Sequence, residues 1–226
     1  MTDSNRPAKT IAVWDLPIRL FHWLVVALVA LAWFTGETEG GAFVIHKLAG
    51  YGVLVAVIFR LQWGLVGSRH ARFRDFVHAW PVVRDYTKEL LALKPRPTLG
   101  HNPLGGWMVI ALLGTLLGVS VSGLFALENG AGGPLAHWLS SNTAHALAEL
   151  HEGIANFLWI LIGVHIAGVV LDSLLTGHNL VWPMFTGRKR VASFERTEVS
   201  AAATPPGWYA AVALGIATAL TWLVVA

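Results

Sequence analysis

The chain has 226 residues, of which 55% are hydrophobic and 13% are charged, and it contains 11 tryptophans and no cysteine. This composition is too apolar for an ordinary soluble domain and predicts an integral membrane protein. The lack of cysteine excludes disulfides, cysteine-ligated iron–sulfur clusters and covalently attached c-type haem. The formal net charge of +3 is distributed unevenly, so it indicates membrane topology and no nucleic-acid partner is expected.

Five apolar stretches are long enough to cross about 30 Å of hydrocarbon. They are Leu16–Thr35, Phe43–Val66, Leu104–Leu127, Leu147–Leu175 and Trp208–Val225. No small-residue cleavage site follows the first stretch, so we expect a mature helix in preference to a removable signal peptide. The fourth stretch exceeds the length of a span, and its beginning is expected to project from the bilayer. The predicted fold class is an all-α integral membrane protein, a four-helix transmembrane bundle with a fifth, C-terminal transmembrane helix.

The stretches divide the chain into three parts. Residues 1–185 form the predicted four-helix core, 186–206 a polar cytoplasmic linker and 207–226 the additional C-terminal helix. Within the core, the connection at about 69–101 mixes basic with apolar residues, which is typical of an amphipathic segment lying on the membrane surface. The fifth helix carries no histidine, so we expect it to be peripheral to the chemistry.

Basic residues concentrate in three places: before and at the beginning of the first stretch, after the second and after the fourth. They are Arg6, Lys9 and Arg19, then Arg69, Arg72, Arg74, Arg84, Lys88, Lys94 and Arg96, then Arg188, Lys189, Arg190 and Arg196. The other two connections carry Glu37, Glu39, Glu128 and Glu149, with Lys47 as the one basic residue near them. Because cytoplasmic segments are enriched in Lys and Arg, the N-terminus is predicted to be cytoplasmic and the C-terminus to lie outside.

Four histidines, His22, His46, His151 and His165, lie in or at the ends of the apolar stretches. Ionisable residues are costly inside a membrane, so they indicate a functional site. Since successive helices run in opposite directions, His22 and His165 fall at the inner depth. His46 and His151 fall at the outer depth, about 21 Å away along the fourth helix. The 14-residue interval returns His165 to within about 40° of the helix face of His151.

Two histidines from separate helices at each of two depths are the arrangement that holds a haem iron from both sides. We therefore predict two non-covalent, bis-histidine b haems. Interhelical hydrogen bonding and a transporter or channel with a histidine proton relay are the alternatives. A zinc or copper site is disfavoured because it would bring three or four ligands together at one point. His145 is the competitor of His151 for the outer site.

Two arginines lie at the depth of the inner pair. Arg60 follows His46 by 14 residues and returns to nearly the same helix face, where it is positioned for a haem propionate. Arg19, one turn before His22, is positioned for the same role or for an interfacial one. Glycines near the histidines provide room for a flat ligand; they are Gly50, Gly52, Gly153, Gly163 and Gly168. The other histidines are expected in solvated or interfacial positions, and these are His70, His78, His101, His137, His145 and His178.

Several motifs, in order, resemble the bacterial cytochrome b561 family over about residues 11–190. They are WDLPIRLFHW from Trp14, HKLAGY from His46, FRLQWG from Phe59, GHNPLGGW from Gly100 and LHE from Leu150, followed by His165. The family includes the cytochrome b subunits of nickel–iron hydrogenases and related quinone-linked electron carriers. The resemblance implies a four-helix core that binds two b haems, with His22, His46, His151 and His165 at the ligand positions.

The expected function is that of a dihaem b-type cytochrome in the bacterial inner membrane. It would transfer single electrons between the quinone pool and a redox partner such as a hydrogenase or a c-type cytochrome. We expect an electron-transfer subunit rather than a stand-alone enzyme, and a homodimer is left open. The alternatives are a self-sufficient superoxide:quinone oxidoreductase and a proton-coupled transporter. Candidates for proton handling at a quinone site are Lys47, Glu149 and Glu152 at the outer side and Asp15 and His70 at the inner side.

Overall fold

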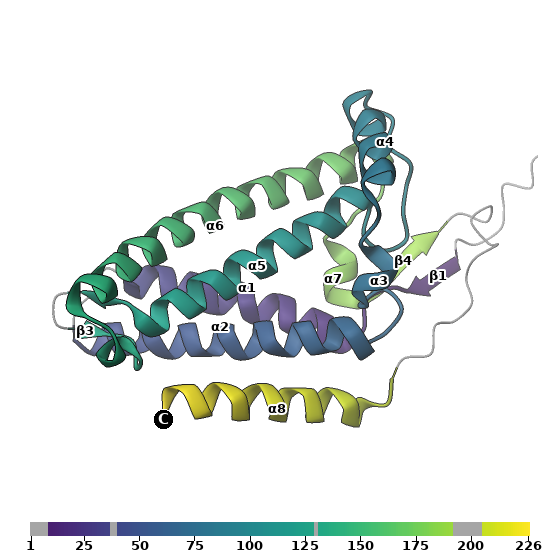
Figure 1. Ribbon diagram of the computed structural model, residues 1–226. Helices are drawn as coiled ribbons and strands as arrows, with labels where there is room; N and C mark the ends of the chain where they lie inside the picture. The colour runs from purple at the N-terminus through teal and green to yellow at the C-terminus, as the bar shows by residue number, and fades with distance from the viewer. Residues whose placement is uncertain (1–8, 37–39, 129–130, 192–204) are drawn as a thin grey trace, which may run out of the picture.

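The computed structural model describes residues 9–36, 40–128, 131–191 and 205–226. Five long helices dominate it (Figure 1): α1 (Leu16–Gly36), α2 (Gly41–Val66), α5 (Pro103–Phe125), α6 (Ser141–Thr176) and α8 (Gly207–Val225). All five are long and apolar enough to cross a membrane, which confirms the predicted all-α membrane fold. At 36 residues, α6 is longer than the roughly 20 residues that a span needs.

The helices start and stop at residues with recognisable capping chemistry. Asp15 Oδ1 accepts a hydrogen bond from the backbone N–H of Ile18 at 2.9 Å, which satisfies a donor in the first turn of α1. Asn102 Oδ1 does the same for Gly105 at 2.6 Å, with Pro103 as the first residue of α5. Helix α6 ends at Thr176 and is capped by Gly177, whose φ of 69° is accessible to glycine at little cost.

The helix core has an apolar middle layer. Helix α1 packs along α2, α5 packs along α6, and α2 contacts α5. Their contact is filled by Val53 and Val57 of α2, Leu116 of α5 and Leu158 of α6. Leu158 stands seven residues from each of the two α6 histidines. The core therefore separates an outer from an inner polar level.

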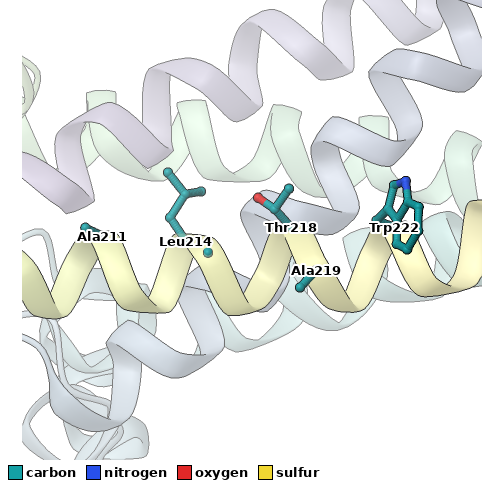
Figure 2. Close-up of a pocket in the computed structure, with 6 residues that line it drawn as sticks. Ala211, Leu214, Thr218, Ala219 and Trp222 are labelled. Atoms are coloured by element: carbon teal, nitrogen blue, oxygen red, sulfur yellow. The ribbon is translucent and has the colours of Figure 1, made fainter.

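Helix α8 packs on α2 at the edge of the bundle (Figure 1). Its small residues Ala213 and Ala217 are buried against Phe59 and Trp63 of α2 and Ile18 of α1. Figure 2 shows exposed residues of α8 around an apolar groove, which is lined by Ala211, Leu214, Gly215, Thr218, Ala219 and Trp222. The outward faces of the long helices are likewise apolar, as expected of surfaces that meet lipid.

Short elements cover the two ends of the bundle. At the end where α1 begins, here called the inner end, lie α3 (Phe73–Phe76), α4 (Trp80–Leu91) and α7 (Trp182–Thr186). Strand β1 (Lys9–Ala12) pairs antiparallel with β4 (Arg188–Val191) at the same end. The opposite, outer end carries β2 (Leu127–Glu128), β3 (Ala131–Gly132) and the short 3-10 helix η1 (Ala136–Trp138). Both ribbons were absent from the sequence prediction, since each has only two short strands.

Two predicted connections are only partly described. Strand β4 occupies the beginning of the predicted linker 186–206, and residues 192–204 lie outside the described residues. Glu37 and Glu39 also lie outside them. In the predicted amphipathic connection, α4 buries Val83 and Tyr86 and exposes Trp80 and Val82, which is the two-faced pattern that the sequence indicates.

Candidate functional site

The outer pair of histidines meets in the core. The ring centres of His46 and His151 are 6.0 Å apart, with the ring planes at 78°. The Nδ1 atom of His46 lies 2.8 Å from the carbonyl oxygen of Ala32, and that of His151 lies 2.8 Å from the carbonyl oxygen of Val119. An Nδ1–H that donates to a carbonyl leaves Nε2 as the nitrogen that can bind a metal. Both rings are thus oriented as metal ligands usually are.

The two outer histidines are seated in the same way on their neighbouring helices. Gly36 comes four residues after Ala32, and Gly123 comes four residues after Val119, so each glycine lies one turn beyond the carbonyl that its histidine contacts. A Cβ atom at Gly123 would be 2.9 Å from Cε1 of His151, and one at Gly36 would be 3.4 Å from Nδ1 of His46. Each ring therefore fills the space that a side chain would occupy. Sequence reasoning missed both glycines, because their spacing from His46 and His151 along the chain does not reveal which helices pair.

The separation of the outer ring centres matches the spacing of two imidazoles that share one metal atom. A metal–imidazole bond of about 2 Å, with about 1 Å more to each ring centre, requires a separation of roughly 6 Å. The observed separation is 6.0 Å. Over the described ranges, no group of three or more His, Asp or Glu side chains is arranged to hold a metal ion. The competitor His145 is exposed on α6, so the structure brings His151 and not His145 to His46.

The inner pair comes from α1 and α6. His22 and His165 are both partly buried. The Nδ1 atom of His22 is hidden from solvent and has no hydrogen-bond partner among the described residues. On α6, a Cβ atom at Gly163 or Gly168 would meet nothing within 4 Å. Gly168 lies within about 60° of His165 around the helix, so the inner level combines a hidden ring nitrogen with helix surface free of side chains beside His165.

Two arginines accompany the inner pair. Arg60 is only 3% exposed, and its guanidinium carbon lies 4.9 Å from the ring centre of Phe73 and 5.8 Å from that of Phe76. Such cation–π contacts support a desolvated charge, yet its Nη1 has no partner in the described chain. Arg19 donates through Nη1 to the carbonyl of Phe185, so part of its guanidinium is used by α7.

His101 is more enclosed than the sequence predicted. Its ring centre lies 4.6 Å from that of Trp14 and 4.5 Å from that of Phe76, and its Nδ1 is hidden without a partner in the described chain. Burial lowers the pKa of His101 to about 3, with further lowering from Arg60, His70 and His165. The residue is partly exposed, in agreement with an interfacial position, but its Nδ1 is enclosed because the connection 69–101 folds back over the inner end.

The two inner candidates for proton handling differ in their surroundings. Asp15 already accepts two hydrogen bonds, through Oδ1 from the backbone of Ile18 and through Oδ2 from Trp63 Nε1 at 2.9 Å. Burial, and then Arg69, lower the pKa of His70, while Asp75 opposes the shift. At the outer end, Glu149 and Glu152 are exposed. Within the described residues, none of these groups is hydrogen-bonded to both members of a histidine pair.

A buried carboxylate that sequence reasoning missed ties three elements together. Asp172 of α6 is 6% exposed. Its Oδ1 accepts from the Tyr86 hydroxyl of α4 at 3.3 Å, and its Oδ2 accepts from Asn102 Nδ2 at 2.8 Å. Because Asn102 also caps α5, this network fixes α4 and the start of α5 against the inner end of α6.

The family described as prokaryotic cytochrome b561 matches residues 13–187 of the chain. A relative from Rhizobium leguminosarum bv. viciae, a "Probable Ni/Fe-hydrogenase B-type cytochrome subunit", is 23% identical over 80% of this chain and 89% of its own length. A protein of the same description from Rhodobacter capsulatus is 25% identical over 83% of this chain and 84% of its own length. The Escherichia coli (strain K12) "Probable Ni/Fe-hydrogenase 1 B-type cytochrome subunit" is 28% identical over 41% of this chain and 49% of its own length. No solved structure gives a significant match.

Proposed function

The chain belongs to the prokaryotic cytochrome b561 family and is a membrane b-type cytochrome of electron transfer, and from this we propose that it carries two bis-histidine haems. His46 and His151 hold the outer haem, and His22 and His165 hold the inner one. The observation that carries the proposal is the 6.0 Å separation of the outer rings, each with Nδ1 bonded to a backbone carbonyl.

The residues of the site favour electron transfer over oxygen chemistry. When bound, a haem with two imidazole ligands supplies one-electron transfer and offers no open position for O₂. The carbonyls of Ala32 and Val119 fix the tautomer and the orientation of the outer imidazoles. The middle layer around Val57 and Leu158 keeps water and charge out of the space between the two levels. The chain therefore holds two redox sites in one apolar core.

We further propose that the electrons pass between the quinone pool and a redox protein at the outer face. The relatives named as hydrogenase cytochrome subunits favour a hydrogenase-like partner, with the N-terminus in the cytoplasm of a bacterial cell. The proposal predicts that a water-soluble quinol reduces the haems of the purified protein. Haems that no quinol reduces and that, once reduced by dithionite, no quinone oxidises would rule out the quinone role.

The haem assignment is tested by pyridine haemochrome analysis of the purified protein and of single His→Ala variants. We expect two b haems per chain. The His46 and His151 variants should each lose the outer haem, and the His22 and His165 variants the inner one, as seen by electron paramagnetic resonance. His145→Ala is the matched control on α6 and should keep both haems. A colourless wild-type protein would refute the assignment and favour the histidine-relay alternative.

A further inference from the structure

We propose that Arg60 and His101 together bind a propionate carboxylate of the inner haem, with Phe76 holding the two side chains in place. This inference rests on the proposed function, because it requires a haem between His22 and His165. The proposal assigns a role to His101, which belongs to neither histidine pair. It also makes His101 a second residue, beside Arg60, that binds the propionate.

Arg60 is a buried cation that lacks a hydrogen-bonded anion in the described chain. The residue is 3% exposed, its Nη1 has no partner there, and aromatic rings cover its guanidinium. A buried charge is costly unless it is paired and hydrogen-bonded. The nearest carboxylate with an electrostatic effect on Arg60 is Asp15, whose two oxygens already accept from Ile18 and Trp63. Nη1 of Arg60 is therefore available to donate to an anionic ligand.

His101 offers a second hidden donor beside the same aromatic ring. Phe76 contacts the ring of His101, with 4.5 Å between ring centres, and also lies under the Arg60 guanidinium at 5.8 Å. Burial, and then Arg60, lower the pKa of His101, which favours the neutral imidazole. A neutral imidazole donates one hydrogen bond, and Nδ1 of His101 has no partner in the described chain. Arg60 supplies charge and His101 supplies a neutral donor.

The cluster lies at the depth of the inner histidines. Arg60 is 14 residues, or about 21 Å, along α2 from His46, and the ring of His101 lies 4.6 Å from that of Trp14, just before the start of α1. Close packing against α5 holds Phe76 in place, since a Cβ atom at Gly106 would lie 2.4 Å from the Phe76 carbonyl oxygen. A carboxylate is the anion that a b haem itself presents, and an arginine binds it through two parallel hydrogen bonds. The propionate of the inner haem is thus an anion that Arg60 and His101 can bind.

The test is potentiometric titration of the purified two-haem protein and its variants. Arg60→Gln should lower the midpoint potential of the inner haem by about 59 mV, which is a tenfold change in the equilibrium constant for its one-electron reduction. The reason is that a positive charge beside the haem is lost. His101→Phe should change the potential in the same direction by less. The double variant should change it by less than the sum, since both residues act on one carboxylate. The outer haem should be unchanged, as should both haems in Arg84→Gln, an exposed inner-end control.

Conservative variants keep the test decisive. Arg60→Lys and His101→Gln should retain most of the wild-type potential, so they separate ligand binding from folding. Loss of the inner haem alone in Arg60→Gln, restored in Arg60→Lys, also supports the proposal. An unchanged inner potential in His101→Phe and Arg60→Gln, with two haems present, overturns it. So does an inner potential that changes on delipidation but not on mutation, because the occupant would then be a lipid phosphate. Absence of haem from the wild type defeats the proposed function instead.

Discussion

Gly123→Ala is the substitution that most directly tests how the outer histidines are seated. The new Cβ atom would lie 2.9 Å from Cε1 and 3.0 Å from Nδ1 of His151. Carbon atoms in contact are normally 3.5–4.0 Å apart, so the imidazole must move by roughly 0.5–1 Å. The Nδ1 atom lies 2.8 Å from the Val119 carbonyl, and a displacement of that size breaks or weakens their hydrogen bond.

The cost follows from these two effects. Overpacking in a filled core costs about 1–3 kcal/mol, and the lost hydrogen bond adds about 0.5–1.5 kcal/mol. If His151 ligates the outer haem, the sum weakens haem binding at that site by about one to three orders of magnitude. We expect purified Gly123→Ala protein to lose outer haem in a pyridine haemochrome assay, and the inner haem to be retained.

A second glycine on the same helix provides the matched control. A Cβ atom at Gly118 would lie 3.7 Å from Ile154, which is ordinary contact, so Gly118→Ala should retain both haems. Gly36→Ala should be intermediate, because its Cβ atom would lie 3.4 Å from His46 Nδ1. Two haems with wild-type affinity and an unchanged paramagnetic resonance spectrum in Gly123→Ala would refute the seating argument.

Three further predictions concern the inner end and the topology. Asp172→Ala leaves Tyr86 and Asn102 unpaired, so it should lower the free energy of unfolding in detergent by about 2–4 kcal/mol. Asp85→Ala, whose carboxylate is 53% exposed, should stay within about 0.5 kcal/mol, and equal effects of the two would contradict the role of the network. Burial and then Asp172 raise the pKa of Tyr86, so the neutral phenol favours the folded state; stability should fall above about pH 10, where the unfolded tyrosine ionises. Tyr86→Phe should flatten that fall in a pH series of thermal unfolding, and an unaltered slope would exclude Tyr86. A reporter enzyme that is active only outside the cytoplasm should be active when it is fused after Ala226. Activity there of a reporter that works only in the cytoplasm would contradict the proposed topology.

Separation of the two levels has a functional consequence. Leu158 lies about 10 Å of helix rise from both His151 and His165, and it packs with Val53 and Val57 in the middle layer. Two redox groups held at these levels would be insulated from water yet close enough for electron exchange. The buried residues of this layer in the described chain, Val53, Val57, Leu116 and Leu158, carry no ionisable group, so any proton exchange would take place nearer an end of the bundle.

The sequence by itself determined the membrane fold and the two levels. Helix lengths follow from apolar runs, which are set locally by the need to satisfy every backbone group within the bilayer. The depth of each histidine follows from helix direction and the rise per residue, so the pairing of His46 with His151 was predictable. The structure confirms the five helices and brings these two rings to 6.0 Å.

Only the tertiary structure decided which neighbouring groups surround those side chains. Gly36 and Gly123 matter because α1 packs on α2 and α5 on α6, and no spacing within one helix reveals which backbone faces a ring. His101 and Asp172 are set by the fold of the connection 69–101 over the inner end, where α3 and α4 contact helices distant in sequence. Periodicity and charge report on single elements, whereas the partners of a buried polar group depend on contacts between elements.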